Sequence, residues 1–89
     1  VNIFPAALDE IMSSFADVIE YRITATRSGE LDQLAVEVED TANDAQRIAD
    51  TIETRLGLHV PVTCVATNSL PRFEGKAKRF IDLRGESTN

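Results

Sequence analysis

The sequence predicts an α+β domain in which two helices pack on one face of a three-stranded sheet, followed by a basic C-terminal loop. Two segments carry apolar residues at the 3.6-residue spacing of a helix, and three shorter segments alternate apolar and polar residues as half-buried strands do. The chain has 89 residues, of which 43% are hydrophobic and 27% charged. A chain of this size forms one domain that buries roughly 60–65% of its unfolded surface, enough for a small core.

The first helix is expected over residues 5–15. Proline is favoured at the first helical position, because its missing N–H has no helical partner there in any case. Asp9 and Glu10 are expected in the first turn, where the helix dipole favours negative charge. The apolar stripe that should face the core has helical spacing and consists of Leu8, Ile11, Met12 and Phe15.

Two strands are expected over residues 18–26 and 31–39, joined by a short polar connection around Gly29 as a hairpin. Alternate residues form an apolar face, expected to lie under the helices: Ile19, Tyr21, Ile23, Ala25, Leu34, Val36 and Val38. The opposite face is polar: Glu20, Arg22, Thr24, Thr26, Glu37 and Glu39. This polar face should meet water in an isolated domain, or another domain in a larger enzyme.

The second helix is expected over residues 43–56, with Asn43 as its N-cap and Gln46 reaching back to it. Gly57 should end it. Its buried stripe is expected to contain Ala45, Ile48, Ala49, Ile52 and Leu56. A third strand should follow, with Val60, Val62 and Cys64 on one face and Pro61 indicating a sheet edge.

Composition and charge exclude several classes of protein. The net charge of −6 and the pI near 4.6 argue against nucleic-acid binding, which needs a broadly basic face. The sequence has no apolar run of about 18 residues that would cross a membrane, and we expect no secretion signal. A single cysteine cannot form an internal disulfide and fits a reducing compartment, so we expect a cytoplasmic protein. Because the sequence begins with Val1, we also expect a domain excised from a longer protein.

The C-terminal region is a local exception to the acidic composition. Five of the nine basic residues lie within residues 72–84: Arg72, Lys76, Lys78, Arg79 and Arg84. Gly75 precedes Lys76, and a glycine–lysine pair allows a tight turn that aims an ammonium group at an anion. From composition alone, a solvated lysine in a basic tail is the favoured explanation of Lys76.

Residues 70–82 read LPRFEGKAKRFID and resemble the closing motif of adenylate-forming acyl-CoA ligases, most of all the phenylacetate-CoA ligase family. The opening residues VNIFP and the hairpin around Gly29 resemble the C-terminal domain of the same family, in the same order. The resemblance implies that residues 1–89 are the mobile C-terminal domain of an AMP-forming acid–CoA ligase. A large N-terminal domain, outside this sequence, would bind ATP and a phenylacetate-like aryl acid.

The resemblance also implies roles for particular residues and partners. Lys76 would contact the substrate carboxylate and the α-phosphate of ATP during adenylation, and the domain would then turn to a second pose for thioester formation. Contacts with phosphates of ATP or coenzyme A are expected from Arg72, Gly75, Lys78 and Arg79. The three basic residues among them are equally well explained as a bridge to the N-terminal domain or as a solubilising loop. Mg²⁺, ATP and coenzyme A would bind the full-length enzyme, so the isolated domain is expected to bind none of them and to be inactive.

Other candidates have simpler interpretations. His59 is a general-base candidate, but without a nearby nucleophile a structural role is favoured, and Cys64 is interpreted as a small core residue. The acidic residues show no metal-loop spacing, so no metal site is expected. Two functional alternatives stay open: a free-standing small-molecule-binding or regulatory module without catalysis, and a ligase-like relative that uses another acid or no coenzyme A.

Overall fold

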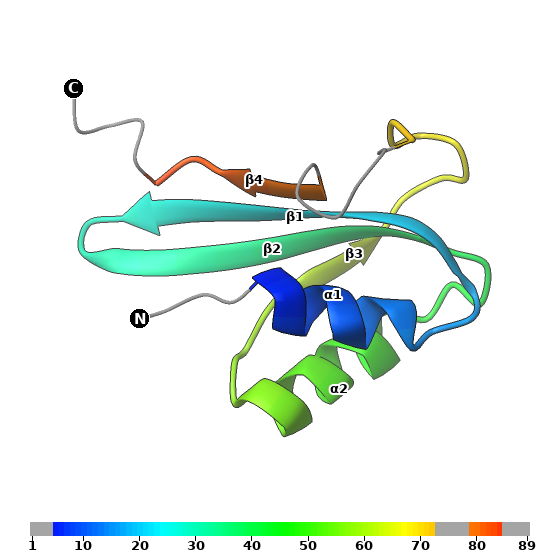
Figure 1. Cartoon of the computed structure of the whole chain (residues 1–89), viewed down its shortest axis with the longest axis horizontal. Helices are drawn as coiled ribbons and strands as arrows, with labels where there is room; N and C mark the ends of the chain where they lie inside the picture. Colours follow the sequence, from blue (N-terminus) through cyan, green and yellow to red (C-terminus); the bar gives the residue numbers. More distant parts are fainter. Residues whose placement is uncertain (1–4, 73–78, 85–89) are drawn as a thin grey trace.

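The computed structural model describes residues 5–72 and 79–84 of the chain. Helix α1 (Pro5–Ser13) precedes a hairpin of two long strands, β1 (Val18–Ser28) and β2 (Leu31–Asp40). Helix α2 (Ala45–Leu56) and two short strands, β3 (Val62–Cys64) and β4 (Phe80–Asp82), follow. The four strands form one sheet in the order β3-β2-β1-β4. The α+β class and the two helices on one face of the sheet are therefore as predicted (Figure 1).

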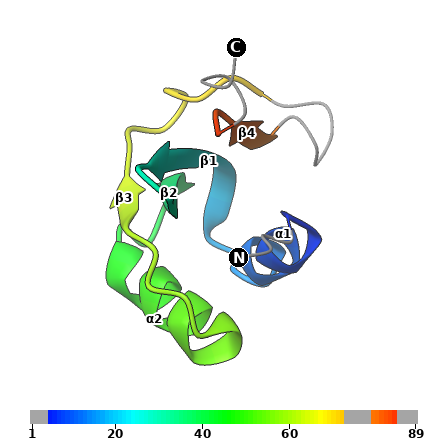
Figure 2. The same cartoon turned by 90° about the vertical axis from the view of Figure 1, so that its left-hand side faces the viewer.

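The sheet is mixed. Strands β1 and β2 pair antiparallel over most of their length, whereas β3 runs parallel to β2 and β4 runs parallel to β1. Both views show the helices on one side of the sheet, while the chain that leaves β3 crosses the opposite side toward β4 (Figures 1 and 2). The two faces of the sheet thus meet different kinds of structure, and on the polar face Gln33 and Ala35 of β2 are exposed.

Helix α1 ends at Ser13, two residues earlier than expected. The N–H groups of Ser14 and Phe15 donate to the carbonyl groups of Ile11 and Met12, three residues back, which closes the last turn. Leu8, Ile11 and Met12 are buried as predicted. The expectation for Asp9 and Glu10 was wrong: both lie beyond the first turn, and Asp9 is only 5% exposed.

The hairpin contains one irregularity that the alternation of residues did not reveal. Val18 is opposite Asp40, but Glu20 is opposite Glu39, so Ile19 is an extra residue in a β-bulge. Its side chain is 46% exposed, which corrects the expectation that it faces the core. Beyond the bulge the register is regular, and the predicted inward residues of both strands line the helix-covered face: Tyr21, Ile23, Ala25, Leu34, Val36 and Val38.

Helix α2 begins one residue later than the capping pattern predicted. Asp44 is the N-cap, and its carboxylate accepts a hydrogen bond from the N–H of Arg47. Asn43 instead has a positive φ of 52°, and the side-chain amide of Gln46 donates to Asp50. The predicted C-terminal stop is confirmed, because Gly57 has a φ of 70° and its N–H donates to the carbonyl of Glu53.

A fourth strand corrects the prediction of three strands followed by a basic loop. Phe80, Ile81 and Asp82 pair with residues 23–25 of β1. A three-residue strand is too short to show alternation, and its basic surroundings indicate a loop. Arg84, directly after β4, donates hydrogen bonds to Asp82 and Asp32, which fastens this strand to the hairpin.

The core lies between the helices and the sheet, and Ile48 and Ile52 of α2 are fully buried in it. Val36, Val38 and Tyr21 of the sheet belong to the same buried cluster. In the described part of the chain, neither helix is long and apolar enough to cross a membrane.

Replacing Ile52 with alanine should lower the free energy of unfolding by about 2–5 kcal/mol, because it leaves a cavity in the centre of the core. Ile19→Ala is the matched control, since the same atoms are removed from a half-exposed bulge residue, and it should change stability by about 0.5 kcal/mol or less. Urea denaturation of the 89-residue chain measures both. Equal losses in the two variants would contradict the assigned core face of α2.

Candidate functional site

The polar face of the sheet is covered, at the end of the hairpin away from its turn, by the chain that follows β3. Glu20 and Glu39, which were expected to face water or another domain, are 3% and 0% exposed. Leu70 of the connection is 5% exposed and lies over the same face. Two carboxylates are therefore enclosed beneath the segment that leads to the glycine–lysine pair.

Glu39 accepts four hydrogen bonds, two on each carboxylate oxygen. The backbone N–H groups of Asn68 and Leu70 donate to Oε1 at 2.8 Å and to Oε2 at 2.9 Å. The guanidinium group of Arg72 donates in a fork, from Nη1 to Oε2 at 3.0 Å and from Nη2 to Oε1 at 2.9 Å. Arg72 also donates to the side-chain oxygen of Asn68 at 2.6 Å. A buried carboxylate is stable only when it is paired and hydrogen-bonded, and here both conditions are met.

Glu20, the cross-strand neighbour of Glu39, binds the other end of the connection. Nε of Arg79 donates to its Oε1 at 2.6 Å, and the N–H of Tyr21 donates to the same oxygen at 3.2 Å. The guanidinium group of Arg79 also lies over the Tyr21 ring, 5.1 Å from its centroid. Arg72 and Arg79 are therefore held on adjacent carboxylates. We call these four residues, Glu20, Glu39, Arg72 and Arg79, the double clasp.

The clasp keeps Glu39 ionised. Hydrogen bonds from Arg72 lower the pKa of Glu39 from its ordinary value of 4.5 to about 2, and the Asn68 and Leu70 amides act in the same direction against the opposing effect of burial. The pKa of Arg72 is raised in turn by its hydrogen bonds to Glu39. At neutral pH both groups are charged.

Two of the predicted site residues thus have internal partners. Arg72 and Arg79 are brought together by the clasp, and their contact with phosphates of ATP or coenzyme A stays a prediction. Lys76, Gly75 and Lys78 lie outside the described residues. Reasoning from sequence missed the carboxylates: the alternation placed Glu20 and Glu39 on one face, but it did not indicate what covers them.

The remaining candidates lie elsewhere. The side chain of His59 is 91% exposed, and its Nδ1 is 3.8 Å from a carboxylate oxygen of Glu53. Cys64 is half-buried against the core, which confirms its interpretation as a packing residue. Among residues 5–72 and 79–84, no group of three or more metal-ligating side chains is arranged to hold a metal ion.

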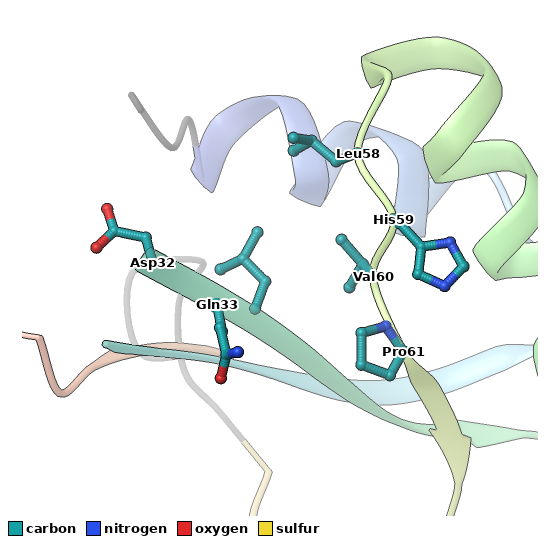
Figure 3. Close-up of a pocket in the computed structure, with 7 residues that line it drawn as sticks. Asp32, Gln33, Leu58, His59, Val60 and Pro61 are labelled. Atoms are coloured by element: carbon teal, nitrogen blue, oxygen red, sulfur yellow. The ribbon is translucent and has the colours of Figure 1, made fainter. Parts of the chain in front are cut away.

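A small pocket lies between the start of β2 and the segment before β3 (Figure 3). Its volume is about 230 Å³, below the roughly 300–1,000 Å³ of pockets for drug-sized ligands. The residues that line it combine an apolar floor with a polar rim: Asp32, Gln33, Leu34, Leu58, His59, Val60 and Pro61. The ring of His59 points to the opposite side of the chain from Val60, away from Leu58 and Gln33 (Figure 3). The pocket therefore offers space for a small group but no converging set of reactive side chains.

Comparison with known proteins gives consistent results. The family described as AMP-binding enzyme C-terminal domain matches residues 1–84. The chain is 35% identical to the phenylacetate-coenzyme A ligase of Escherichia coli (strain K12) and 32% identical to that of Pseudomonas putida. Each alignment covers 94% of this chain but 22% of the relative, so the chain spans about a fifth of the length of these relatives.

Solved structures resemble the chain over a similar extent. A domain of phenylacetate-coenzyme A ligase from Bacteroides vulgatus ATCC 8482 has 26% identity and a TM-score of 0.74, with 94% of this chain and 87% of that chain covered. A 2-hydroxyisobutyryl-CoA ligase with 2-HIB-AMP and CoA, in the thioesterification state, has 29% identity and a TM-score of 0.78, with coverage of 94% and 20%. The same ligase in the postadenylation state with 2-HIB-AMP has a TM-score of 0.76, with coverage of 91% and 20%.

The clasp predicts an acid-dependent loss of stability. Because the pKa of Glu39 is lower in the folded chain than its ordinary value, its contribution is fully present above about pH 4.5 and is lost as the pH falls toward about 2. Glu39→Gln should therefore be less stable at neutral pH, and its free energy of unfolding should fall less steeply over this interval. Urea denaturation at a series of pH values measures the slope.

Glu37→Gln is the matched control for this prediction, because it removes the carboxylate of the half-exposed Arg22–Glu37 pair on the same face. Comparison of the two slopes separates loss of the clasped carboxylate from loss of one negative charge on this face. An unchanged slope in Glu39→Gln would contradict the ionised, clasped state of this carboxylate.

Proposed function

This chain belongs to the family of AMP-binding enzyme C-terminal domains, and we propose on that premise that it is the C-terminal domain of an ATP-dependent, AMP-forming carboxylic acid–CoA ligase. The observation that carries the proposal is the match over residues 1–84, together with curated relatives that are phenylacetate-coenzyme A ligases. Because those relatives are several times longer, the ATP, acid, Mg²⁺ and coenzyme A sites are assigned to an N-terminal domain outside this sequence. Phenylacetate or a related aryl acid is the proposed substrate.

The proposed reaction has two steps. In the first, a carboxylate oxygen of the acid attacks the α-phosphorus of ATP, an acyl-adenylate forms and pyrophosphate leaves. In the second, the thiol of coenzyme A loses its proton and attacks the acyl carbonyl, a thioester forms and AMP leaves. The first step brings two anions together, so a fixed cation at the reacting groups stabilises its transition state.

We assign that cation to Lys76. The double clasp supports this assignment over a solvated tail, because residues on both sides of Lys76 in the sequence, Arg72 and Arg79, are held on buried carboxylates of the sheet. Strand β4, which pairs with β1, begins directly after Arg79. A lysine is suited to such a role, since its ammonium group is a compact charge on a long stem.

The proposal includes two poses of the domain, one for each step. The 2-hydroxyisobutyryl-CoA ligase matches this chain with TM-scores of 0.76 in its postadenylation state and 0.78 in its thioesterification state. A single domain fold common to both states supports motion of the domain as one body. The alternative of a free-standing binding module has less support, because the relatives extend far beyond this domain.

The isolated chain should fold but release no pyrophosphate from ATP and phenylacetate. Independent folding is expected because the chain has its own core, and because the Bacteroides vulgatus domain, 87% of which is covered, is a structure of the domain alone. One lysine without an ATP site cannot complete an adenylation. A pyrophosphate-release assay on the folded chain checks this, and turnover by the fragment would refute the domain assignment.

In the full-length enzyme, Lys76→Ala should lower ATP-dependent activation of the acid by about 10²–10³-fold, the loss expected for one preorganised electrostatic contact. Thioester formation from prepared acyl-adenylate and coenzyme A should stay nearly intact. Pyrophosphate exchange without coenzyme A measures the first step, and thioester yield measures the second.

Lys78→Ala is the control for Lys76→Ala, because it removes the same charge two residues away, and it should affect either step less. If Lys76→Ala slowed both steps equally, the residue would be a general anchor for anions or for folding, and its step-specific assignment would be wrong.

A further inference from the structure

Burial of Glu39 needs an explanation beyond stability. A buried ion pair costs several kcal/mol in desolvation per ion, so replacing such a pair with packed apolar residues is often neutral or even stabilising. This domain has a core of apolar residues on the other face of the sheet. What a carboxylate adds, and an apolar residue does not, is direction: each of its hydrogen bonds holds a particular donor at a particular place.

The donors to Glu39 define the path of one short stretch of chain. They come from residues 68, 70 and 72, that is, from every second residue of the connection from β3 to β4. The backbone is fixed at two of these positions and the side chain at the third. Asn68 has a positive φ of 69°, an uncommon conformation in which asparagine is enriched, and its side chain accepts from Arg72. The stretch that ends at Arg72 is therefore held at several points.

The other pair on this face shows the contrast. Arg22 and Glu37 are also joined across the strands, with Nε of Arg22 2.8 Å from Oε1 of Glu37, but their side chains are 30% and 37% exposed. Both belong to the hairpin, so their pairing fixes no part of the connection. Both Arg22–Glu37 and Arg72–Glu39 are arginine–carboxylate pairs, but only the second binds the segment before Lys76.

We propose that Glu39 is a positioning residue for the adenylation step: with Glu20, it places the two ends of the segment that carries Lys76, through Arg72 and Arg79. This inference rests on the proposed role of Lys76. Glu39 touches no reacting atom; it acts through Arg72 and the amides of residues 68 and 70. Loss of its charge loosens the fork to Arg72, because a glutamine presents one acceptor oxygen where the carboxylate presents two.

The test uses the full-length enzyme with phenylacetate, and it measures both steps separately. Glu39→Gln should lower the rate constant of adenylation by about 10–100-fold, since misplacement by about 1 Å has effects of this size. The KM for ATP and the rate of thioester formation from prepared phenylacetyl-adenylate should change by about twofold or less, as expected for sites that do not interact. Glu37→Gln is the matched control and should leave both steps unchanged.

A double-mutant cycle separates positioning from a general effect on folding. If Glu39 acts through Lys76, then Glu39→Gln should change adenylation by about twofold or less once Lys76 is alanine, because the group it positions is gone. A purely structural role would lower activity by the same factor in either background. Thermal unfolding shows which variants are folded at the assay temperature.

The outcomes distinguish the two proposals. If Lys76→Ala leaves adenylation intact, the proposed role of Lys76 fails and this inference fails with it. Two results would overturn the inference while the role of Lys76 stands, provided that Lys76→Ala slows adenylation. In the first, Glu39→Gln has no more effect on adenylation than Glu37→Gln. In the second, Glu39→Gln slows adenylation by the same factor whether residue 76 is lysine or alanine. Where Glu39→Gln does not fold, Arg72→Lys replaces it in the same cycle, since lysine keeps the charge but lacks the two-pronged fork.

Discussion

A carboxylate with no exposure to solvent, on Glu39 near the end of β2, is the constraint that positions the chain after β3 as far as Arg72. Removed from water and unpaired, this charge would destabilise the domain, so donors must reach it from outside the hairpin. The connection after β3 supplies them from Asn68, Leu70 and Arg72. Detaching the connection would remove these donors from a buried carboxylate. The course of the chain across the polar face is therefore set by hydrogen bonds to Glu39 together with the burial of Leu70.

The two faces of the sheet are consequently held by forces of different character. On the helix-covered face, Ile48 and Ile52 pack with the apolar residues of β1 and β2, and such packing tolerates small shifts if volume is kept. On the opposite face, hydrogen bonds between charged groups fix distance and direction. The β-bulge at Ile19 contributes to this second face, since it brings Glu20 directly opposite Glu39. For the proposed role of Lys76, such fixed hydrogen bonds to the residues that flank its segment are an advantage.

Sequence patterns predicted the features that depend on neighbouring residues. The alternation of Val36 and Val38, the helical stripe through Ile48 and Ile52, and the αL stop at Gly57 are all local, and all are confirmed. The bulge was missed because register depends on the partner strand, and β4 was missed because three residues carry no periodic signal. Burial of the two carboxylates was missed because Arg72 is 33 residues from Glu39, and Arg79 is 59 residues from Glu20. Lys76 was singled out by resemblance to a family, since no local pattern distinguishes it from a solvated lysine.

The arginines and the lysines of the basic C-terminal run therefore differ in what they are expected to bind. Its three arginines, Arg72, Arg79 and Arg84, all donate to carboxylates of the sheet or of β4 itself, where the planar guanidinium group matches the geometry of a carboxylate. The sequence around these arginines resembles an anion-binding tail, but at these positions the positive charges pair with acidic residues of the same chain, whose net charge is −6. Lysine, with a compact charge on a flexible stem, occupies the position that the family resemblance assigns to catalysis. Arg72 and Arg79 are thus held on buried carboxylates, and the two lysines of the run, Lys76 and Lys78, lie between them in the sequence.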